Sequence, residues 1–542
     1  MEETNAQRIL IIGAGPVGLA LALDLGRRGV RSTIIERSSG TGTEFLAKAD
    51  YLNERSMEFC RLLGLQEEIA NAGFPDDVTR DTVFCTSLNG HFIGRLPMPS
   101  LKERKLPPQC REMHRRCPQF WFDPMLARAV IRQGMCEIHY GHEFVRCEDD
   151  HQGVTCTVKR CEDGQNQKIR TDYLVACDGL ASSVRKAVQI DRSGKELGYS
   201  VSVVVRAHNL SEKHPFGKGE RYMFISPEGV WSNLTAIDGR SLYRFTVVGS
   251  EERLDPEQLD MNALVVKAFG RDDIEFELMR TLPWRRSQFT ADTFSKGRVI
   301  LAGDSAHTMS PTGGHGLNTG LGDVMDLSWI LQALTEGWGG PGLLEAYTEE
   351  RRPVAIRNGS SSSQNYAIWV ERNGREQVLQ DGVEADEQRR VLGEQMVASL
   401  EQEFRSLGIA MGYNYAASPI IVPDGTPAPP DEPSSYVQTA RPGHRAPHCW
   451  LEDGSSIIDR FGKGFVLLNF KEGVSGGDDL ALVAEKLGVP LELVDISNTE
   501  AAKLYERHMV MVRPDGMVAW RGDALPDDIH GLLDRVRGMS CR

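Results

Sequence analysis

A strand, a glycine-rich turn and a helix at the start of the chain restrict its fold more than any other feature. Residues 9–12 are all apolar and predict a strand buried on both faces. Three glycines follow in GxGxxG spacing, at Gly13, Gly15 and Gly18, and an apolar helical pattern continues to Leu25. The first glycine permits the tight turn, the second lets a diphosphate approach the backbone, and the third lets the helix pack on the strand. The diphosphate would lie at the positive end of the helix, so the pattern predicts a Rossmann-type dinucleotide-binding domain.

The next strand carries the acid that this type of domain uses. Residues 32–35 are strand-like and end at Glu36. Its carboxylate is placed to accept hydrogen bonds from ribose hydroxyls, which favours the unphosphorylated ribose of FAD or NAD over a 2′-phosphate. Glycine-rich turns also occur for packing reasons, but a strand, a helix and a terminal acid in register favour dinucleotide binding.

Two later motifs repeat the pattern of a buried strand followed by an acid. The apolar stretch 299–302 leads into Gly303-Asp304, and a glycine-rich stretch follows at 311–320. An aspartate there can bind a ribityl hydroxyl, and the N–H groups after it can face a polar ring edge. The alternative is an N-cap aspartate with a flexible loop. The strand at 173–177 leads into Asp178-Gly179, which could equally be a turn before a capped helix.

Composition excludes several classes of function. A chain of 542 residues is too long for one core, so two to four domains are expected. The net charge of −14 argues against nucleic acid or an anionic membrane as partner. No apolar run approaches the ~20 residues that span a bilayer, and no export leader precedes the first strand, so a cytoplasmic protein is expected. The eleven cysteines have neither CxxC nor metal-ligand spacing, which predicts no disulfide framework and no metal site.

The three motifs, in this order and at this spacing, resemble those of the class A flavoprotein monooxygenases, which have the para-hydroxybenzoate hydroxylase fold. The resemblance extends to residues 347–353, which are similar to the family's helix after the flavin. Residues 441–447 and 513–516 are similar to the thioredoxin-like C-terminal domain of the phenol hydroxylase branch. The resemblance therefore covers nearly the whole chain.

This resemblance implies a flavin-dependent hydroxylase. In the family, NAD(P)H reduces FAD, O2 adds at flavin C4a, and the hydroperoxide delivers oxygen to a phenolic ring. The protein would supply position, a dry pocket and a means to deprotonate the phenol. No second dinucleotide fingerprint is present, consistent with a nicotinamide that docks transiently. The residues expected to bind cofactor are Gly13, Gly15, Pro16, Gly18, Glu36, Arg37, Lys48, Gln119, Asp178, Asp304, Pro311, Gly314, Gly316, Leu317 and Asn318.

Three residues are candidates for the chemistry at the substrate. Asp50 occupies the position of an active-site aspartate in phenol hydroxylases and could accept the phenol proton; otherwise it is a turn aspartate. Tyr222 and Arg244, on the inserted sheet, could line the substrate site, although such residues are often structural. His315 could contact oxygen or substrate, but an exposed loop histidine is the simpler expectation.

The C-terminal domain lacks the residues for dithiol chemistry. Cys449 has no CxxC partner, so we predict a structural or dimer-supporting role, with a homodimer as the assembly it would support. An alternative activity for the same flavin is Baeyer–Villiger insertion or ring modification of a polyketide-derived aromatic. A more remote alternative is a flavin-binding scaffold that never turns over. The missing WxWxIP motif and the lack of a terminal apolar helix disfavour a halogenase and a membrane-bound epoxidase.

The expected fold is therefore an α/β Rossmann-type FAD-binding domain with an inserted antiparallel β-sheet substrate domain and a thioredoxin-like C-terminal domain. Strands are expected in the insert at 201–205, 222–225 and 242–248. The expected segments are FAD-binding domain 1–80, substrate domain 81–110, FAD-binding domain 111–195, substrate domain 196–290, FAD-binding domain 291–365, helical connector 366–417, a proline-rich surface linker 418–447 and the thioredoxin-like domain 448–542.

Overall fold

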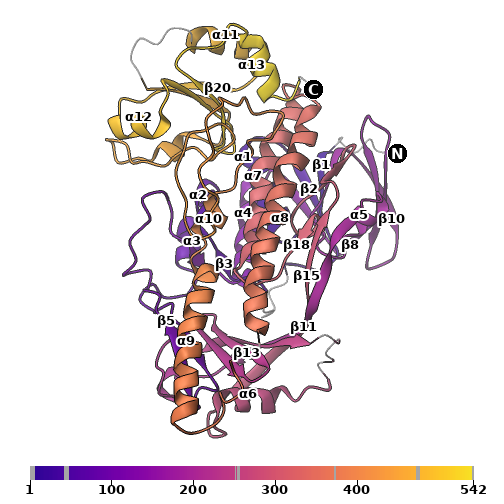
Figure 1. Ribbon diagram of the computed structural model, residues 1–542. Coiled ribbons are helices and arrows are strands. Elements are labelled where there is room, and N and C mark those ends of the chain that lie inside the picture. Colours follow the sequence, from indigo (N-terminus) through magenta and orange to yellow (C-terminus); the bar gives the residue numbers. More distant parts are fainter. Residues whose placement is uncertain are drawn as a thin grey trace.

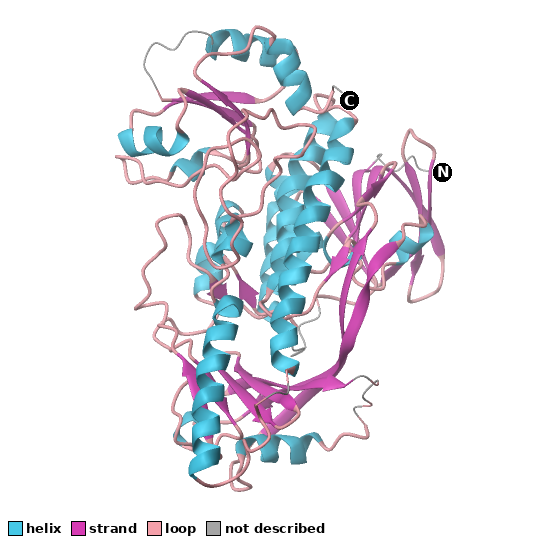
Figure 2. Ribbon diagram, viewed as in Figure 1, coloured by secondary structure: helices cyan, strands magenta, loops and turns pink. Residues whose placement is uncertain are grey.

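The computed structural model describes residues 7–41, 48–250, 252, 255, 257–371, 374–470 and 477–539. Within these residues the chain forms two eight-stranded sheets, one four-stranded sheet and one two-stranded ribbon. One large sheet lies beside a group of long helices and the other lies below them, while the four-stranded sheet belongs to a C-terminal unit at the top of the view (Figure 1, Figure 2). The predicted α/β architecture is confirmed.

The first large sheet is the predicted Rossmann-type sheet, and β1 lies near its centre because its residues are apolar on both faces. Its neighbours run parallel to it, so that Ile11 lies opposite Ile34 on one side and Val175 on the other. The strand order is β16 (Ser295–Lys296), β17 (Val299–Leu301), β10 (Asn166–Ala176), β1 (Gln7–Ile12), β2 (Ser32–Glu36) and β7 (Cys136–Tyr140), with β9 (Val154–Arg160) pairing β10 and β8 (His142–Asp149) pairing β9.

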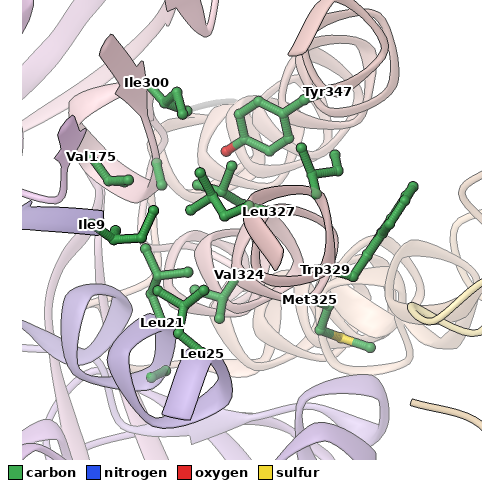
Figure 3. Close-up of a cluster of buried hydrophobic side chains, with 14 of the residues drawn as sticks. Ile9, Leu21, Leu25, Val175, Ile300, Val324, Met325, Leu327, Trp329 and Tyr347 are labelled. Carbon is green, nitrogen blue, oxygen red and sulfur yellow. The ribbon is translucent and has the colours of Figure 1, made fainter. Parts of the chain in front are cut away.

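Three helices cover this sheet: α1 (Pro16–Arg27), α4 (Gln119–Gln133) and α7 (His315–Glu336). Figure 3 shows where side chains of β1, α1 and α7 meet those of β10 and β17 in one apolar layer. Ile9, Leu21 and Leu327 are fully buried there. The layer fixes α7, and with it the glycine-rich loop at its start, against the strand ends.

The second large sheet is mostly antiparallel, as predicted, and includes three strands that the sequence analysis missed, β13, β15 and β18. The residues in the first half of β15 are half-buried or exposed, and Glu277 and Arg280 interrupt its apolar pattern. The helix α6 (Met261–Phe269) packs on one face, and the other face packs against the helices that follow the FAD-binding segments. The strand order is β18 (His307–Thr308), β15 (Glu277–Ala291), β11 (Arg192–Arg206), β14 (Leu242–Ser250), β13 (Gly229–Ala236), β12 (Arg221–Ser226), β4 (Thr82–Cys85) and β5 (Phe92–Leu96).

A long helix, α8 (Gly342–Val370), runs from the C-terminal unit to the second sheet (Figure 1). The boundary expected between residues 365 and 366 therefore lies inside a continuous helix, and the other expected boundaries stay predictions. The helices α9 (Val383–Phe404) and α10 (Leu407–Met411) follow. Within the described ranges, no helix is both long and apolar enough to cross a bilayer.

The shorter elements near the site are α2 (Glu54–Leu62), α3 (Gln66–Ala70), α5 (Ser183–Ala187) and a ribbon of β3 (Tyr51–Leu52) with β6 (Arg115–Arg116). The helix α2 begins just after Asn53, whose side chain caps it by accepting a hydrogen bond from the Ser56 N–H at 2.9 Å. This cap fixes the direction in which the chain leaves the ribbon.

The C-terminal unit has the predicted thioredoxin-like topology. A parallel pair, β19 (Phe465–Asn469) and β20 (Leu491–Asp495), is joined to the antiparallel pair β21 (Met509–Val512) and β22 (Val518–Gly522) in the order β20-β19-β21-β22. The accompanying helices are α11 (Gly477–Lys486), α12 (Thr499–Tyr505) and α13 (Ile529–Val536).

The proline-rich segment 418–447 differs from its expectation at both ends, because Ile420 and Ile421 near its start are buried, as are residues near its end. It was expected to lie over the surface, yet Ala440, His444 and Arg445 are buried. The backbone explains the difference: the Gly443 N–H donates to the Val518 carbonyl at 2.8 Å, so the segment runs along β22. Composition identified the absence of helix and strand but not this packing.

Candidate active site

Four of the predicted cofactor residues meet at one edge of the first sheet. Gly13 follows β1, Glu36 ends β2, Asp178 follows β10, and Asp304 follows β17. These strands are parallel neighbours, so their carboxyl ends lie side by side. In open α/β sheets this edge is where a dinucleotide binds.

The glycine-rich turn has the steric features of a diphosphate cradle. A Cβ at Gly13 would lie 2.4 Å from the Cys177 carbonyl oxygen, and one at Gly18 would lie 2.1 Å from the Gly13 oxygen. A Cβ at Gly15, in contrast, would meet nothing within 4 Å. The helix begins at Pro16, and no side chain caps it. The first and third glycines are therefore required by packing, while the second leaves the N-terminus of α1 open to an anion.

Glu36 is held against this turn by two backbone groups. Its carboxylate accepts from the Ala14 N–H and from the Ser38 N–H, each at 2.8 Å. These bonds fix the acid beside the cradle, where its contact with a ribose stays a prediction. Arg37 beside it is exposed.

Asp178 and Gln119 also lie at this edge. One Asp178 oxygen accepts from the Val184 N–H at 3.2 Å, and the other is buried without a partner among the described residues. The Gln119 side chain donates to Asp123 at 2.9 Å, and burial raises the pKa of Asp123 to about 7. The exposed Lys48 is close enough to Asp123 to interact with it electrostatically. The sequence analysis missed Asp123, which stands one helical turn after Gln119.

The loop before α7 approaches the same region from the other side. Gly313 and Gly314 both have positive φ, +86° and +69°, so the chain bends sharply after Pro311. Gly316 and Leu317 lie in the first turn of α7. In this arrangement residues 311–317 can border a planar ring that extends from Asp304.

Asn318 joins this loop to the segment that carries Asp50. Its side chain accepts from the Asn53 N–H at 2.9 Å and donates to the Tyr51 and Gly314 carbonyls at 3.0 and 2.6 Å. On the other side, the Cys117 N–H donates to the Asp50 carbonyl at 3.0 Å. Asp50 is therefore fixed between the loop and the ribbon. Asn318 therefore links the loop to the segment that carries Asp50. The sequence analysis predicted only a cofactor-binding role for it.

Asp50 forms ion pairs with two arginines. Arg116 donates to its carboxylate at 2.8 Å, and Arg244 lies 3.0 Å from the same oxygen. Burial raises the pKa of Asp50, but the nearby charges of Arg116, Arg244 and Arg221 outweigh burial and hold this pKa below its usual value. Asp50 is therefore ionised at neutral pH and is a weak proton acceptor. The predicted pair Asp50 and Arg244 is brought together, with Arg244 also donating to the Lys48 carbonyl at 2.8 Å.

The ion pairs continue through residues that the sequence analysis missed. Glu220 accepts from Arg116 at 2.8 Å and from Arg80 at 3.0 Å. Arg221 donates to Glu403 of α9 at 3.0 Å. Glu403 also accepts from the indole N–H of Trp369 at 2.7 Å. These partners come from segments far apart in the chain, so no local pattern could have indicated them.

Tyr222, which was predicted to line the substrate site, faces away from the ion pairs around Asp50. Strand pairing places Arg221 and Arg244 in one cross-strand row, whereas Tyr222 lies in the next row with Phe245 and therefore faces the opposite side. Tyr222 is 2 % exposed, and its hydroxyl donates to the Gly217 carbonyl at 2.6 Å. It packs under α6, while its neighbour Arg221 faces the site.

His315 also differs from its expectation. It is 4 % exposed and is the first residue of α7, so it is not an exposed loop histidine. Burial, together with the charge of Arg357, lowers the pKa of His315 to about 4. Its imidazole is therefore neutral at physiological pH.

These residues fit an FAD molecule. The open backbone at Gly15 suits the diphosphate, the unpartnered oxygen of Asp178 can accept from a hydroxyl or ring N–H, and Asp304 is exposed at its strand end. The described residues contain no group of three or more metal-ligating side chains.

Comparison with known proteins agrees with this geometry. Residues 6–361 match the family described as FAD binding domain, and residues 439–539 match the family described as aromatic-ring hydroxylase, C-terminal. The chain belongs to the class A FAD-dependent monooxygenases. It is an oxidoreductase with FAD as cofactor, and NAD(P)H is the co-substrate typical of these enzymes.

Relatives match this monooxygenase over nearly its full length. The FAD-dependent monooxygenase apdD of Emericella nidulans is 29 % identical, with 97 % of this chain and 89 % of the relative covered. The putative polyketide hydroxylase of Streptomyces halstedii is 31 % identical, with 95 % and 93 % covered. The structure of the rebeccamycin biosynthetic enzyme RebC with reduced flavin has a TM-score of 0.91 and 37 % identity, covering 99 % of both chains.

Proposed function

We propose that this monooxygenase hydroxylates a phenolic aromatic substrate, with NAD(P)H and O2 as co-substrates. The observation that carries the proposal is the ion-pair cluster beside residues 311–317, the loop that is predicted to border the flavin. Four guanidiniums, of Arg80, Arg116, Arg221 and Arg244, surround the carboxylates of Asp50, Glu220 and Glu403. The excess of positive charge among these largely buried side chains favours an anionic group on the substrate.

A phenolate meets this requirement. Ionisation makes the ring a better nucleophile, and a guanidinium near the oxygen lowers the pKa of the phenol. Arg244 is the group best placed for this role, because its side chain is 19 % exposed while that of Arg116 is 2 % exposed. Asp50 orients Arg244 rather than removing the proton itself, since its own pKa is held low. The bound FAD supplies the oxygen-transfer chemistry.

A polycyclic, polyketide-derived substrate is favoured by one finding. The Streptomyces halstedii relative is named a putative polyketide hydroxylase and matches 95 % of this chain. Oxygen insertion into a ketone of such a substrate is the second candidate activity, because the same cofactor can perform it. The two activities differ in product structure rather than in the residues that hold the flavin.

The test is a screen of the purified holoenzyme with simple phenols, hydroxybenzoates and polycyclic phenolic ketones. NAD(P)H oxidation and H2O2 release are recorded together, and products are analysed by mass spectrometry and NMR. We expect one class to accelerate NAD(P)H oxidation and to give a ring-hydroxylated product with little H2O2. A product in which oxygen has been inserted beside a ketone carbonyl would favour the second candidate activity over ring hydroxylation. If NAD(P)H is not oxidised at all, with or without any aromatic, both candidates are contradicted and a non-catalytic flavoprotein is favoured.

A further inference from the structure

The turn that carries Asp304 is held from behind by one buried carboxylate. An Asp323 oxygen accepts from the Gly303 N–H at 2.9 Å and lies 2.7 Å from the His307 Nε2. Asp323 is fully buried on α7. Both ends of the turn around Asp304 are therefore fixed by a single side chain.

Arg351 of α8 holds this carboxylate in place. It donates to the other Asp323 oxygen at 2.8 Å, to the Thr319 carbonyl at 2.9 Å and to the Tyr415 hydroxyl at 2.7 Å. A Cβ at Gly322 would lie 2.6 Å from the Arg351 guanidinium, so the glycine makes room for it. All three bonds are buried, and each fixes the plane of the guanidinium.

Tyr415 lies outside the FAD-binding segments, after α10. Its hydroxyl donates to Asp326 of α7 at 2.6 Å, and its backbone N–H donates to the Gly443 carbonyl at 2.6 Å. Gly443 in turn is bonded to β22. The orientation of Arg351 thus depends on a residue that the C-terminal domain holds.

The C-terminal domain also binds α8 directly. Arg513, just after β21, makes two parallel bonds to Glu350, at 2.6 and 2.8 Å, and also pairs with Asp515. Asp515 accepts from the Trp329 indole of α7 at 3.1 Å. Glu350 precedes Arg351 in sequence, so the same helical turn is fixed by the C-terminal domain and by the flavin-site carboxylate.

The contact of the C-terminal domain with α7 and α8 consists of buried charged groups, so a shift of one group affects the others. Asp326 faces Arg351, Arg513, Glu350 and Asp515 as well as Tyr415. Burial raises the pKa of Asp326 to about 8. A buried guanidinium that loses its partner cannot be rehydrated without movement of the helices, so displacement of one member displaces the others.

We propose that the C-terminal domain, through Arg513 and Tyr415, positions the Gly303-Asp304 turn of the flavin site. The proposal rests on the assignment of Asp304 to FAD but not on the identity of the aromatic substrate. It gives the domain a task for which a dithiol is not needed. Arg513 and Tyr415 act through Arg351 and Asp323 and are positioning residues.

The test compares two tyrosine-to-phenylalanine variants of the full chain. Tyr415→Phe removes the hydroxyl between Arg351 and Asp326 but keeps the ring. Tyr505→Phe is the matched control, because that buried hydroxyl donates to the Pro447 carbonyl at 2.8 Å within the C-terminal region, away from the chain of contacts described above. Each apo-protein is titrated with FAD, and its melting temperature and the visible absorption band of the bound flavin are recorded.

We expect Tyr415→Phe to weaken FAD binding about tenfold and to shift the flavin band. Tyr505→Phe should lower the melting temperature by a similar amount and leave FAD affinity and the band unchanged. Unchanged FAD affinity in Tyr415→Phe, or an equal loss in both variants, would overturn the proposal. Since no turnover is measured, a wrong substrate class would leave this result unaffected. Arg513→Lys, which keeps the charge but loses the paired bonds, should behave like Tyr415→Phe.

Discussion

The glycine-rich turn allows a sharp test of where the cofactor diphosphate lies. Gly15 has φ −74°, which any residue adopts, and a Cβ there would meet no atom within 4 Å. Gly15→Ala therefore adds a methyl group into open space. The substitution lowers the entropy of the unfolded chain, which stabilises the fold by about 0.4–1 kcal/mol. Alanine is also a poorer helix cap than glycine, which offsets this gain by a similar amount. The free energy of unfolding of the apo-protein should therefore stay within about 1 kcal/mol of the wild-type value.

Gly18→Ala is the matched comparison, three residues further along the same turn. Its Cβ would lie 2.1 Å from the Gly13 carbonyl oxygen, so α1 must move away from β1. Overpacking of this kind costs about 1–3 kcal/mol. Gly18→Ala should thus lower both the apo-protein melting temperature and FAD affinity.

The two variants are measured by thermal melting of the apo-proteins and by titration with FAD. If the diphosphate lies against Gly15, the methyl group added in Gly15→Ala should weaken FAD binding at least about tenfold, or about 1.4 kcal/mol. The melting temperature of the apo-protein should hardly change. Wild-type FAD affinity in Gly15→Ala would refute the placement. A melting temperature that falls as far as in Gly18→Ala would refute the steric reasoning.

Three further predictions concern single side chains. Asp50→Asn should lower kcat/KM for the aromatic substrate about 10–150-fold, because it weakens the ion pair that orients Arg244 and the charged hydrogen bond from Arg116, and a charged hydrogen bond is worth about 1.5–3 kcal/mol. FAD affinity should stay unchanged, and an equal loss of both would contradict this role. Tyr222→Phe should lower the free energy of unfolding by about 1 kcal/mol and leave turnover within about twofold, as steady-state kinetics and denaturant titration can show. A large loss of turnover would place Tyr222 at the site after all. Asp326 has a raised pKa of about 8, so the folded protein binds its proton more tightly than the unfolded chain. Its contribution to stability is full below about pH 4 and is lost as pH rises to about 8; Asp326→Asn should flatten this decline in pH-dependent melting, and an unchanged profile would disprove it.

The cofactor edge could be predicted from sequence because each of its parts is local. The glycines, Glu36, Asp178 and Asp304 each follow an apolar strand, and parallel pairing then brings the strand ends together. Local signals of this kind need no knowledge of which strands are neighbours.

The substrate side could be predicted only in part. Asp50 and Arg244 were identified and do meet, but Tyr222 was placed on the wrong face. Alternation along β12 shows that Tyr222 and Arg221 face opposite sides, yet it does not show which side meets the flavin loop. That choice is made by α6 and α9, and the α9 residue Glu403 lies 182 residues away from Arg221.

Composition also misjudged burial in two places. His315 stands among glycines and was expected to be exposed, but it begins a helix packed against the first sheet. The proline-rich segment was expected at the surface, but Arg445 pairs with Glu58 of α2 at 2.6 Å. The burial of Arg445 depends on a partner 387 residues away, which no window of sequence contains.

The central claim is that the ion-pair cluster around Asp50 holds a phenolic ring for oxygen transfer from the flavin. The most direct test supplies isotopically labelled O2 to the holoenzyme with NAD(P)H and the aromatic that most accelerates NAD(P)H oxidation. The account predicts a product with one labelled oxygen, bonded to a ring carbon of the phenol, and little labelled H2O2. A product whose new oxygen comes from water, or labelled H2O2 with an unchanged aromatic, would contradict it.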